Sequence, residues 1–332
     1  MPCKRRLLST IAALVCGAVL SSGAADAAER LRVAGNFPAD HTATEAMEVF
    51  KTELEKATDG AIKVDLFPAM QLGGAQENVD QVRSGTIFGV FTSIAYFTRT
   101  VPEYEAVSLP FLFDSREDAF RVIDGPVGAL FDAKMAEKGF VNLGYGELGF
   151  RHTTNNLRPI TGVADFKDMK IRLQPNEVHL ETFRALGANP VAMDVKELYS
   201  ALQQGVLDGQ ENPYNIIATR RFNEVQKHLS NSGHFYDFIN AVANKRLFDK
   251  LSPDHQKAVR AAMKAAMDWQ RAEAAKRDDE WRQELVKRGM TFTPISDETR
   301  AELRKATASV VEGLKTRIDP KVIDMVLAEA AK

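Results

Sequence analysis

Two arginines stand where a guanidinium is unusual, and they carry the clearest chemistry in the sequence. Arg172 lies between Ile171 and Leu173 in a short strand-like segment, and Arg151 follows the glycine-rich segment 144–149. A guanidinium flanked by apolar residues is costly to bury unless it is solvated or paired. One interpretation of Arg172 is therefore a buried salt bridge, for which the candidate partners are Asp165, Asp168 and Glu197. The other is an anion receptor, because the planar fork of arginine matches a carboxylate bidentately.

A polar turn is the third feature that could bind a ligand. The segment Gln210-Glu211-Asn212-Pro213 places an amide and a carboxylate at the end of a short strand that begins at Leu207. Open α/β sheets bind their ligands outside the carboxyl ends of the strands. We therefore expect Asn212 to face a cleft.

Other chemistries find weaker support. Residues 144–149 match GxGxxG, but residues 150–156 lack the helical period that a pyrophosphate site needs, so we interpret the glycines as flexible strand–turn positions. The sequence contains no GxSxG, HExxH, SxxK or Walker motif. His41, His152 and His179 could meet as a zinc site, although their spacing does not support one; they could equally be polar residues around a cleft or surface histidines. We predict no catalytic residue, no metal and no cofactor.

The N-terminus predicts export. Lys4, Arg5 and Arg6 precede a mostly apolar run over 7–20, and the small-x-small segment 25–27 completes a signal peptide cleaved near Ala27. The run is too short for a membrane anchor, which needs about 20 residues. Cleavage removes both cysteines, at positions 3 and 16, which excludes disulfides and thiol chemistry from the exported chain.

Composition and periodicity indicate two interleaved α/β domains. The 332 residues suffice for about two domains, and 43 basic against 45 acidic side chains argue against nucleic-acid binding. The pattern predicts strands and helices in alternation, with strands at 31–36, 62–67, 87–91, 140–143, 170–173 and 207–213, and helices ending near 60, 84, 186 and 204. The order within residues 31–91 favours a largely parallel sheet. A long helix from Ser252 to Arg288, about 50 Å, is long enough to lie across both domains.

Six segments in order resemble one family. They are 71–74 (QLGG), 109–111 (LPF), 151–160 (RHTTNNLRPI), 168–172 (DMKIR), 186–190 (LGANP) and 201–213 (ALQQGVLDGQENP). Together they resemble the DctP-type solute-binding proteins of TRAP transporters, over nearly the whole mature chain. The resemblance implies a periplasmic-binding-protein-like α/β fold, in which two domains flank a hinged cleft and a long helix spans both. By analogy, domain I is 28–149 plus 238–277, domain II is 150–237 plus 278–332, and 1–27 is the signal peptide.

The resemblance also implies a function and a set of ligand-binding residues. It implies a monomeric periplasmic receptor, not an enzyme, that delivers a small carboxylate to the subunits of an ion-gradient-driven membrane permease and touches the membrane only through them. The carboxylate clamp falls on Arg172, the second arginine on Arg151 and the cleft amide on Asn212. The remaining candidates are Asn36, His41, Ser93, Tyr96, His152 and Gln174. Ser93 stands where relatives that bind amino-sugar acids carry a glutamate, which argues against an amino-substituted ligand.

Three ligand hypotheses follow. Because hydroxyl and amide donors are numerous, we expect a hydroxylated sugar acid such as a uronate or aldonate. A C4-dicarboxylate is the alternative within the family. A periplasmic enzyme acting on an organic acid is the alternative from another class, and it would need a nucleophile–base pair or a metal that the sequence does not display.

Overall fold

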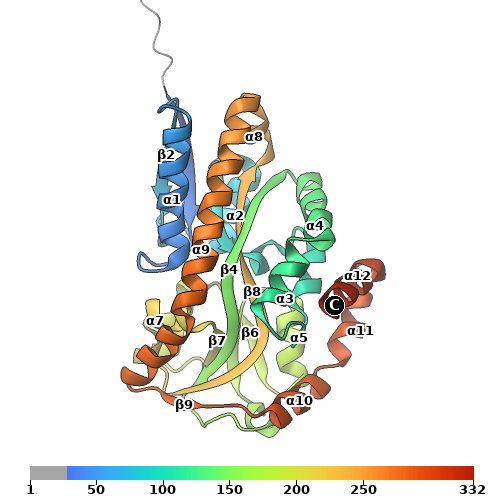
Figure 1. Cartoon of the computed structure of the whole chain (residues 1–332). Helices are drawn as coiled ribbons and strands as arrows, with labels where there is room; N and C mark the ends of the chain where they lie inside the picture. Colours follow the sequence, from blue (N-terminus) through green and yellow to red (C-terminus); the bar gives the residue numbers. More distant parts are fainter. Residues whose placement is uncertain (1–27) are drawn as a thin grey trace, which may run out of the picture.

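The computed structural model describes residues 28–332 as one mixed α/β fold (Figure 1). The predicted signal peptide lies outside the described residues. None of the helices between residues 28 and 332 is both long and apolar enough to cross a membrane.

A single nine-stranded sheet runs through the molecule, with the strand order β2-β1-β3-β8-β4-β7-β5-β6 and β9 paired to β8. The strands are β1 Glu29–Gly35, β2 Ile62–Phe67, β3 Gly89–Ser93, β4 Phe140–Asn155, β5 Lys170–Leu173, β6 Asn189–Ala192, β7 Gly209–Asn212, β8 His228–Asn244 and β9 Thr291–Thr293. Pairing is parallel among β1, β2 and β3 and among β5, β6 and β7. The prediction of a largely parallel arrangement from residues 31–91 is therefore confirmed for β1–β3, whereas the two central strands pair antiparallel to each other and to β3 and β7.

The helices are α1 Thr42–Ala57, α2 Ala75–Ser84, α3 Arg116–Ile123, α4 Pro126–Glu137, α5 Glu177–Ala185, α6 Val195–Gln203, α7 Tyr214–Thr219, α8 Lys245–Lys250, α9 Pro253–Lys287, α10 Asp297–Ala306, α11 Ser309–Lys315 and α12 Pro320–Ala330. Two lobes result. We call β1–β3 with α1–α4 the β1 lobe, and β5–β7 with α5–α7 the β5 lobe. Strands β4 and β8 pass through both lobes (Figure 1).

Helix α9 lies along β4 and contacts α1 in the β1 lobe and α7 in the β5 lobe, as the predicted long helix requires (Figure 1). Ser252 caps it by accepting a hydrogen bond from the amide of His255. Glycines in β4 permit the close approach, because a Cβ on Gly144 would lie 3.0 Å from Met267 and one on Gly146 would lie 2.6 Å from Gln270. The interpretation of 144–149 as strand–turn positions was therefore wrong about the turn: Gly144 and Gly146 make room for a helix, and the strand continues to Asn155.

The core lies on both faces of the sheet. One apolar cluster packs under α1, α7 and α9 and includes Phe50, Leu148 and Ile217. A second lies under α2–α4 and α12, where Phe131 and Ile323 are buried. A smaller cluster fills the β5 lobe. Because α12 packs against α3 while α11 packs against α5, the C-terminal helices also join the two lobes.

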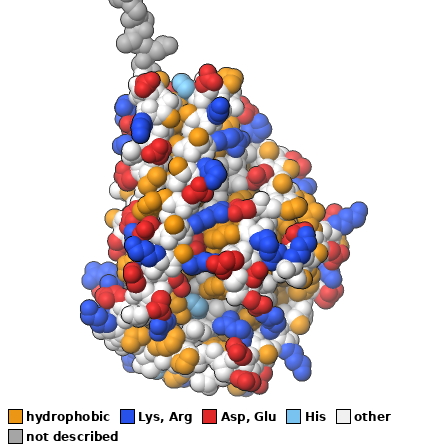
Figure 2. Space-filling view, in the orientation of Figure 1, with side chains coloured by type: hydrophobic (Ala, Val, Ile, Leu, Met, Phe, Trp, Pro, Cys, Tyr) orange, Lys and Arg blue, Asp and Glu red, His pale blue; other side chains and the backbone are white. Residues whose placement is uncertain are grey.

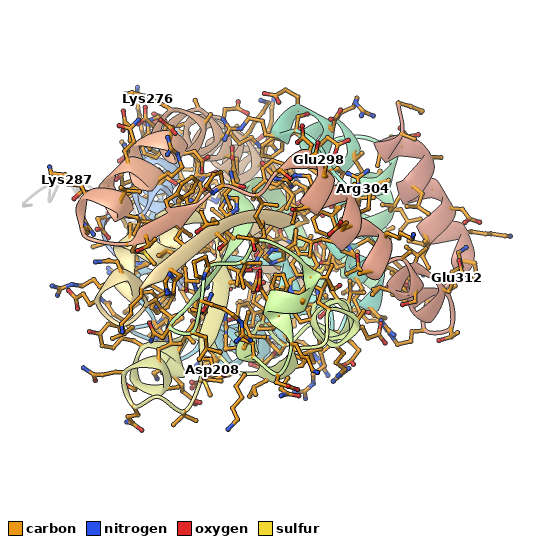
Figure 3. All side chains as sticks on the ribbon, turned by 90° about the horizontal axis from the view of Figure 1, so that it is seen from below. Asp208, Lys276, Lys287, Glu298, Arg304 and Glu312 are labelled. Carbon is orange, nitrogen blue, oxygen red and sulfur yellow. The ribbon has the colours of Figure 1, made fainter. Side chains whose placement is uncertain are left out.

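Charged side chains are interspersed over the outside. Figure 2 shows basic and acidic groups mixed on the face that carries α9, in keeping with the nearly balanced charge of the chain. Seen from below, Lys276 and Lys287 of α9 and Glu312 of α11 lie at the rim of the molecule, whereas Glu298 and Arg304 of α10 lie within its outline (Figure 3). Arg304 pairs with Asp114, which precedes α3 of the β1 lobe, at 2.8 Å.

Candidate functional site

A small cavity lies between the two lobes, where strand ends meet. Asn36 follows β1, Ser93 ends β3, Gln174 follows β5 and Asn212 ends β7. Its volume is about 20 Å³, room for one or two water molecules. The lining residues are Asn36, Phe37, Thr92, Ser93, Tyr96, Leu148, Arg172, Gln174, Val195, Asn212, Ile216 and Arg220.

Five buried polar atoms of this lining have no hydrogen-bond partner. They are Asn36 Oδ1, Thr92 Oγ1, Arg172 Nη1, Gln174 Oε1 and Arg220 Nε. Buried polar groups in folded proteins are nearly always paired, since an unmade hydrogen bond costs about 1–3 kcal/mol. The cavity wall therefore concentrates hydrogen-bonding capacity that the protein itself leaves unused.

Arg172 is fully buried in β5 without an anionic partner. Its Nε donates to the carbonyl of Met193 at 2.8 Å and its Nη2 donates to the hydroxyl of Tyr96 at 3.2 Å. Neither acceptor carries a charge, and within the described part of the chain the guanidinium makes no ion pair. The salt-bridge interpretation with Asp165, Asp168 or Glu197 is therefore wrong: the positive charge of Arg172 is left for another group to balance.

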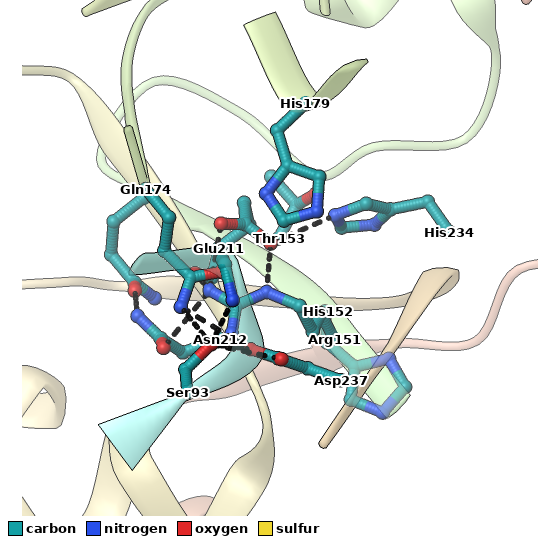
Figure 4. Close-up of polar contacts among 12 residues, drawn as sticks. Ser93, Arg151, His152, Thr153, Gln174, His179, Glu211, Asn212, His234 and Asp237 are labelled. Atoms are coloured by element: carbon teal, nitrogen blue, oxygen red, sulfur yellow. Dashed lines mark hydrogen bonds and ion pairs between the residues drawn. The ribbon is translucent and has the colours of Figure 1, made fainter. Parts of the chain in front are cut away.

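Arg151 is equally buried, but every nitrogen of its guanidinium is paired (Figure 4). Nε and Nη2 hold the Glu211 carboxylate at 2.5 and 2.8 Å, and Nη1 holds Asp237 at 2.8 Å. Nη2 also donates to the side-chain oxygen of Asn212 at 3.1 Å. Arg151 lies within β4, beside the cavity wall rather than in it, so the structure does not place this predicted ligand-binding arginine in the cavity lining.

The two carboxylates that hold Arg151 differ in their titration. Burial alone would raise the pKa of Glu211, but Arg151 and His234 outweigh it and hold that pKa well below its usual range. Burial raises the pKa of Asp237, against the opposing effect of Arg151, Ser93 and Gln174. Asp237 is the acceptor in each of its side-chain hydrogen bonds, with Ser93, Arg151 and Gln174 as donors, as an ionised carboxylate requires.

Sequence reasoning missed Arg220. It lies at the end of α7, donates to the backbone carbonyl of Asn36 in the other lobe, and has no carboxylate partner among residues 28–332. Burial, with a smaller effect of Arg172, lowers its pKa to about 10. A signal existed: α7 starts directly after Asn212-Pro213, and Ile216 and Arg220 are four residues apart, so they share the helical face that lines the cavity.

The structure brings some of the predicted residues together and separates others. Asn36, Ser93, Tyr96, Gln174 and Asn212 line the cavity with Arg172. Ser93 donates to Asp237 at 2.9 Å and accepts from the Gln174 amide at 2.9 Å, so these two residues connect the cavity to the Arg151 network (Figure 4).

Neither His41 nor His152 lines the cavity. His41 caps α1 by accepting from the amide of Ala43 at 3.0 Å, and burial lowers its pKa to about 3. His152 stacks on Tyr214 with ring centroids 4.1 Å apart and faces a separate groove of about 520 Å³. No group of three His, Cys, Asp or Glu side chains in the described residues could hold a metal ion.

Comparisons with known proteins agree with this architecture. Residues 33–316 match the family model of the bacterial extracellular solute-binding proteins, family 7 (DctP). A sugar-acid-binding protein from Advenella mimigardefordensis, solved with galactonate, superposes with a TM-score of 0.89 at 32% identity, covering 92% of this chain and 98% of that one. A TRAP periplasmic solute-binding protein from Polaromonas sp. JS666, bound to D-erythronate, superposes with a TM-score of 0.87 at 35% identity, covering 90% and 98%. The C4-dicarboxylate-binding periplasmic protein of Rhodobacter capsulatus is 32% identical over 85% of each chain.

Proposed function

The chain belongs to family 7 of the bacterial extracellular solute-binding proteins, and from this membership we propose that it is a periplasmic receptor that binds an organic acid, closes around it and delivers it to a TRAP membrane permease driven by an ion gradient. Its role is binding, not catalysis. The observation that carries this proposal is the pair Arg172 and Arg220, two buried guanidiniums without carboxylate partners that line one cavity.

The charge balance around the cavity favours one anionic group in the ligand. Within residues 28–332, three guanidiniums (Arg151, Arg172 and Arg220) face only two carboxylates in direct contact with any of them, Glu211 and Asp237, so one positive charge has no contacting partner when both are ionised; Asp194 acts on Arg220 without forming an ion pair. An uncompensated buried charge costs several kcal/mol, and a ligand carboxylate removes that cost. Arg172 Nη1 is the free donor that would clamp it.

The orientation of two amides favours a ligand that also carries hydroxyl groups. The amide nitrogen of Gln174 donates to Asp237, which only accepts, so its oxygen must face the cavity. The amide of Asn78 donates to the carbonyl of Leu72, so Asn78 presents its oxygen to the amide nitrogen of Asn36. The oxygen of Asn36 therefore also faces the cavity. Two obligatory acceptors require donors from the ligand, and sugar-acid hydroxyls supply them.

A C4-dicarboxylate is the second candidate, and Arg220 is the observation that favours it. Its second carboxylate could pair with the Arg220 guanidinium. An unsubstituted member such as succinate carries no hydroxyl for Asn36 and Gln174 and would leave both of their buried oxygens unpaired, and a member with a single hydroxyl would satisfy only one of them. We therefore place a uronate or aldonate first.

Binding requires the lobes to move. The cavity of about 20 Å³ is too small for a sugar acid, so entry takes place in a more open form and the cavity must be wider than this when the ligand is bound. Closure is favoured only to the extent that the ligand binds the closed form better than the open one. Strands β4 and β8, which cross between the lobes, are the connections that would bend. Closure also excludes water, which strengthens each polar contact.

A thermal-shift panel tests the function. Purified residues 28–332 would be melted with D-galactonate, D-erythronate, D-glucuronate, D-galacturonate and succinate. An acid present at 100 times its Kd should raise the unfolding free energy by about 2.7 kcal/mol. The receptor proposal fails if no acid shifts the melting temperature. Each acid that binds would also be incubated with the protein and followed by NMR. Conversion of the acid into a product would favour the enzyme alternative.

A further inference from the structure

Helix α2 of the β1 lobe has no side-chain cap of its own, and a residue of the other lobe takes that place. The N-cap position of α2 is Gly74, which offers no side chain. The amide of Gln76, the second residue of the helix, donates instead to Asp194 Oδ2 at 3.2 Å. An N-cap side chain accepts from the second or third amide of its helix, so Asp194 acts as the cap of α2 from 118 residues away.

Asp194 is at the same time the ordinary cap of its own helix. It precedes α6 in the β5 lobe, and its Oδ1 accepts from the amide of Lys196 at 3.0 Å. One carboxylate therefore bridges two helix N-termini that belong to opposite lobes. Both ends carry partial positive charge, which a carboxylate stabilises.

A second contact at the same helix end reaches the ligand clamp. The amide of Val195, the first residue of α6, donates to the hydroxyl of Tyr96 in the β1 lobe at 3.3 Å. The same hydroxyl accepts from Arg172 Nη2 at 3.2 Å. Arg172, Tyr96 and the start of α6 thus form a continuous path from the cavity to Asp194.

We propose that Asp194 is the positioning residue that holds the cleft closed, by capping α2 across the gap between the lobes. Closing the cleft gives α2 its cap, and opening it removes that cap while α6 keeps its own. Gly74 makes the contact possible, because a Cβ there would lie 2.9 Å from Asp194 Oδ2. The inference rests on the proposed receptor function for its ligand-dependent effect, but the cross-lobe contact can be tested without a ligand.

Asp194→Asn is the main variant, because it keeps one cap and removes the other. An asparagine oxygen can still cap α6. Its amide nitrogen cannot accept from Gln76, and its negative charge is gone. We expect D-galactonate to dissociate about tenfold faster, equivalent to 1.4 kcal/mol, with a smaller change in the association rate. Stopped-flow fluorescence would measure both rates, and succinate would replace D-galactonate if only succinate shifts the melting temperature.

Two further variants separate the latch from an ordinary cap. Asp319 caps α12 alone through the amide of Lys321 at 3.0 Å, so Asp319→Asn is the matched control and should leave the dissociation rate unchanged. Gly74→Ala disrupts the same contact from the α2 side, because its Cβ would crowd Asp194 Oδ2. It leaves the Asp194 side chain chemically unchanged and should match Asp194→Asn in the direction of its effect. A similar acceleration in Asp319→Asn would overturn the proposal.

The ligand-free measurement is a distance between the two helices. Residues 28–332 contain no cysteine, so spin labels at Asp80→Cys on α2 and Ser200→Cys on α6, both exposed positions, report only the cleft. We expect the distance distribution of Asp194→Asn to move to longer values than that of the otherwise unaltered labelled protein. Identical distributions, with and without acid, would overturn the latch. Failure of every acid to bind would remove the receptor function and leave this measurement valid.

Discussion

Two buried arginines of this protein lie on the strands that flank β7, Arg151 on β4 and Arg172 on β5, and have opposite surroundings. Arg151 is neutralised by Glu211 and Asp237, whereas Arg172 meets only a carbonyl and a hydroxyl. Burial and residue type are the same in both cases, so neither identifies the binding group. The difference lies in the compensation of charge: a paired guanidinium supports the structure, and an unpaired one is available to an anion.

The largest expected effect is the loss of stability when Arg151, the paired arginine, is replaced. Arg151→Met leaves two buried carboxylates without their cation, and removal of one partner from a buried ion pair costs about 3–5 kcal/mol. Urea unfolding monitored by circular dichroism should show a loss of this size. A loss below about 1 kcal/mol would mean that the Arg151 network is not a structural element.

The same substitution in the unpaired region should act on binding instead. Arg172→Met removes a charge that has no carboxylate partner within residues 28–332, so the unfolding free energy should fall by no more than about 1 kcal/mol. The affinity for D-galactonate should fall at least ~100-fold, because the ligand carboxylate loses its cation and each 1.4 kcal/mol is tenfold. Calorimetric titration would measure the affinity. Arg172→Lys is the matched control and should recover only part of it, because an ammonium cannot make two parallel bonds. Unchanged affinity in Arg172→Met would exclude the clamp.

The contrast also explains how far the sequence could predict the site. Arg172 was recognisable because its neighbours in the same strand are apolar, which is a local signal. The pairing of Arg151 was not, because Glu211 and Asp237 follow it by 60 and 86 residues and meet it only through the register of β4 with β7 and β8. Arg220 was missed for the same reason: next to Arg221 it resembles a solvated cation, and only the position of α7 buries it.

The fold was predictable where its pattern is local. The long helix has a clear N-cap, and the predicted strands that correspond to β1, β2, β3, β5 and β7 have local patterns; the structure confirms these, whereas β6 and β9 were not predicted. Strand β8 escaped prediction because it buries polar groups such as Ser232, His234 and Asp237, which pair with residues of β4, β7 and β3. Such a strand shows no alternation of apolar and polar residues, since its polar side chains are satisfied by partners distant in sequence.

Lowering the pH should destabilise the region around Arg151 through Glu211, by less than the two substitutions above. The pKa of Glu211 is held well below its unfolded value, chiefly by Arg151 against the opposing effect of burial. This group therefore contributes stability that is present above pH ~4.5 and is lost as pH falls below it, by up to about 1.4 kcal/mol per pH unit for one proton. Urea unfolding between pH 6 and pH 3 should show this slope in the wild type and a shallower one in Glu211→Gln. Parallel slopes would mean that Glu211 is not the titrating group.

The smallest expected effect is on affinity, and it distinguishes recognition of the ligand's carboxylate from recognition of its hydroxyl groups. Asn36 and Gln174 present amide oxygens to the cavity, and an ordinary hydrogen bond contributes about 0.5–1.5 kcal/mol. Asn36→Ala should therefore weaken D-galactonate binding by about 2- to 12-fold and leave succinate, which has no hydroxyl group, unaffected. Calorimetric titration of both acids against wild type and variant gives the ratio. Equal losses for the two acids would indicate that Asn36 shapes the cavity rather than accepting a hydroxyl, and the preference for a sugar acid would then rest on Gln174 alone.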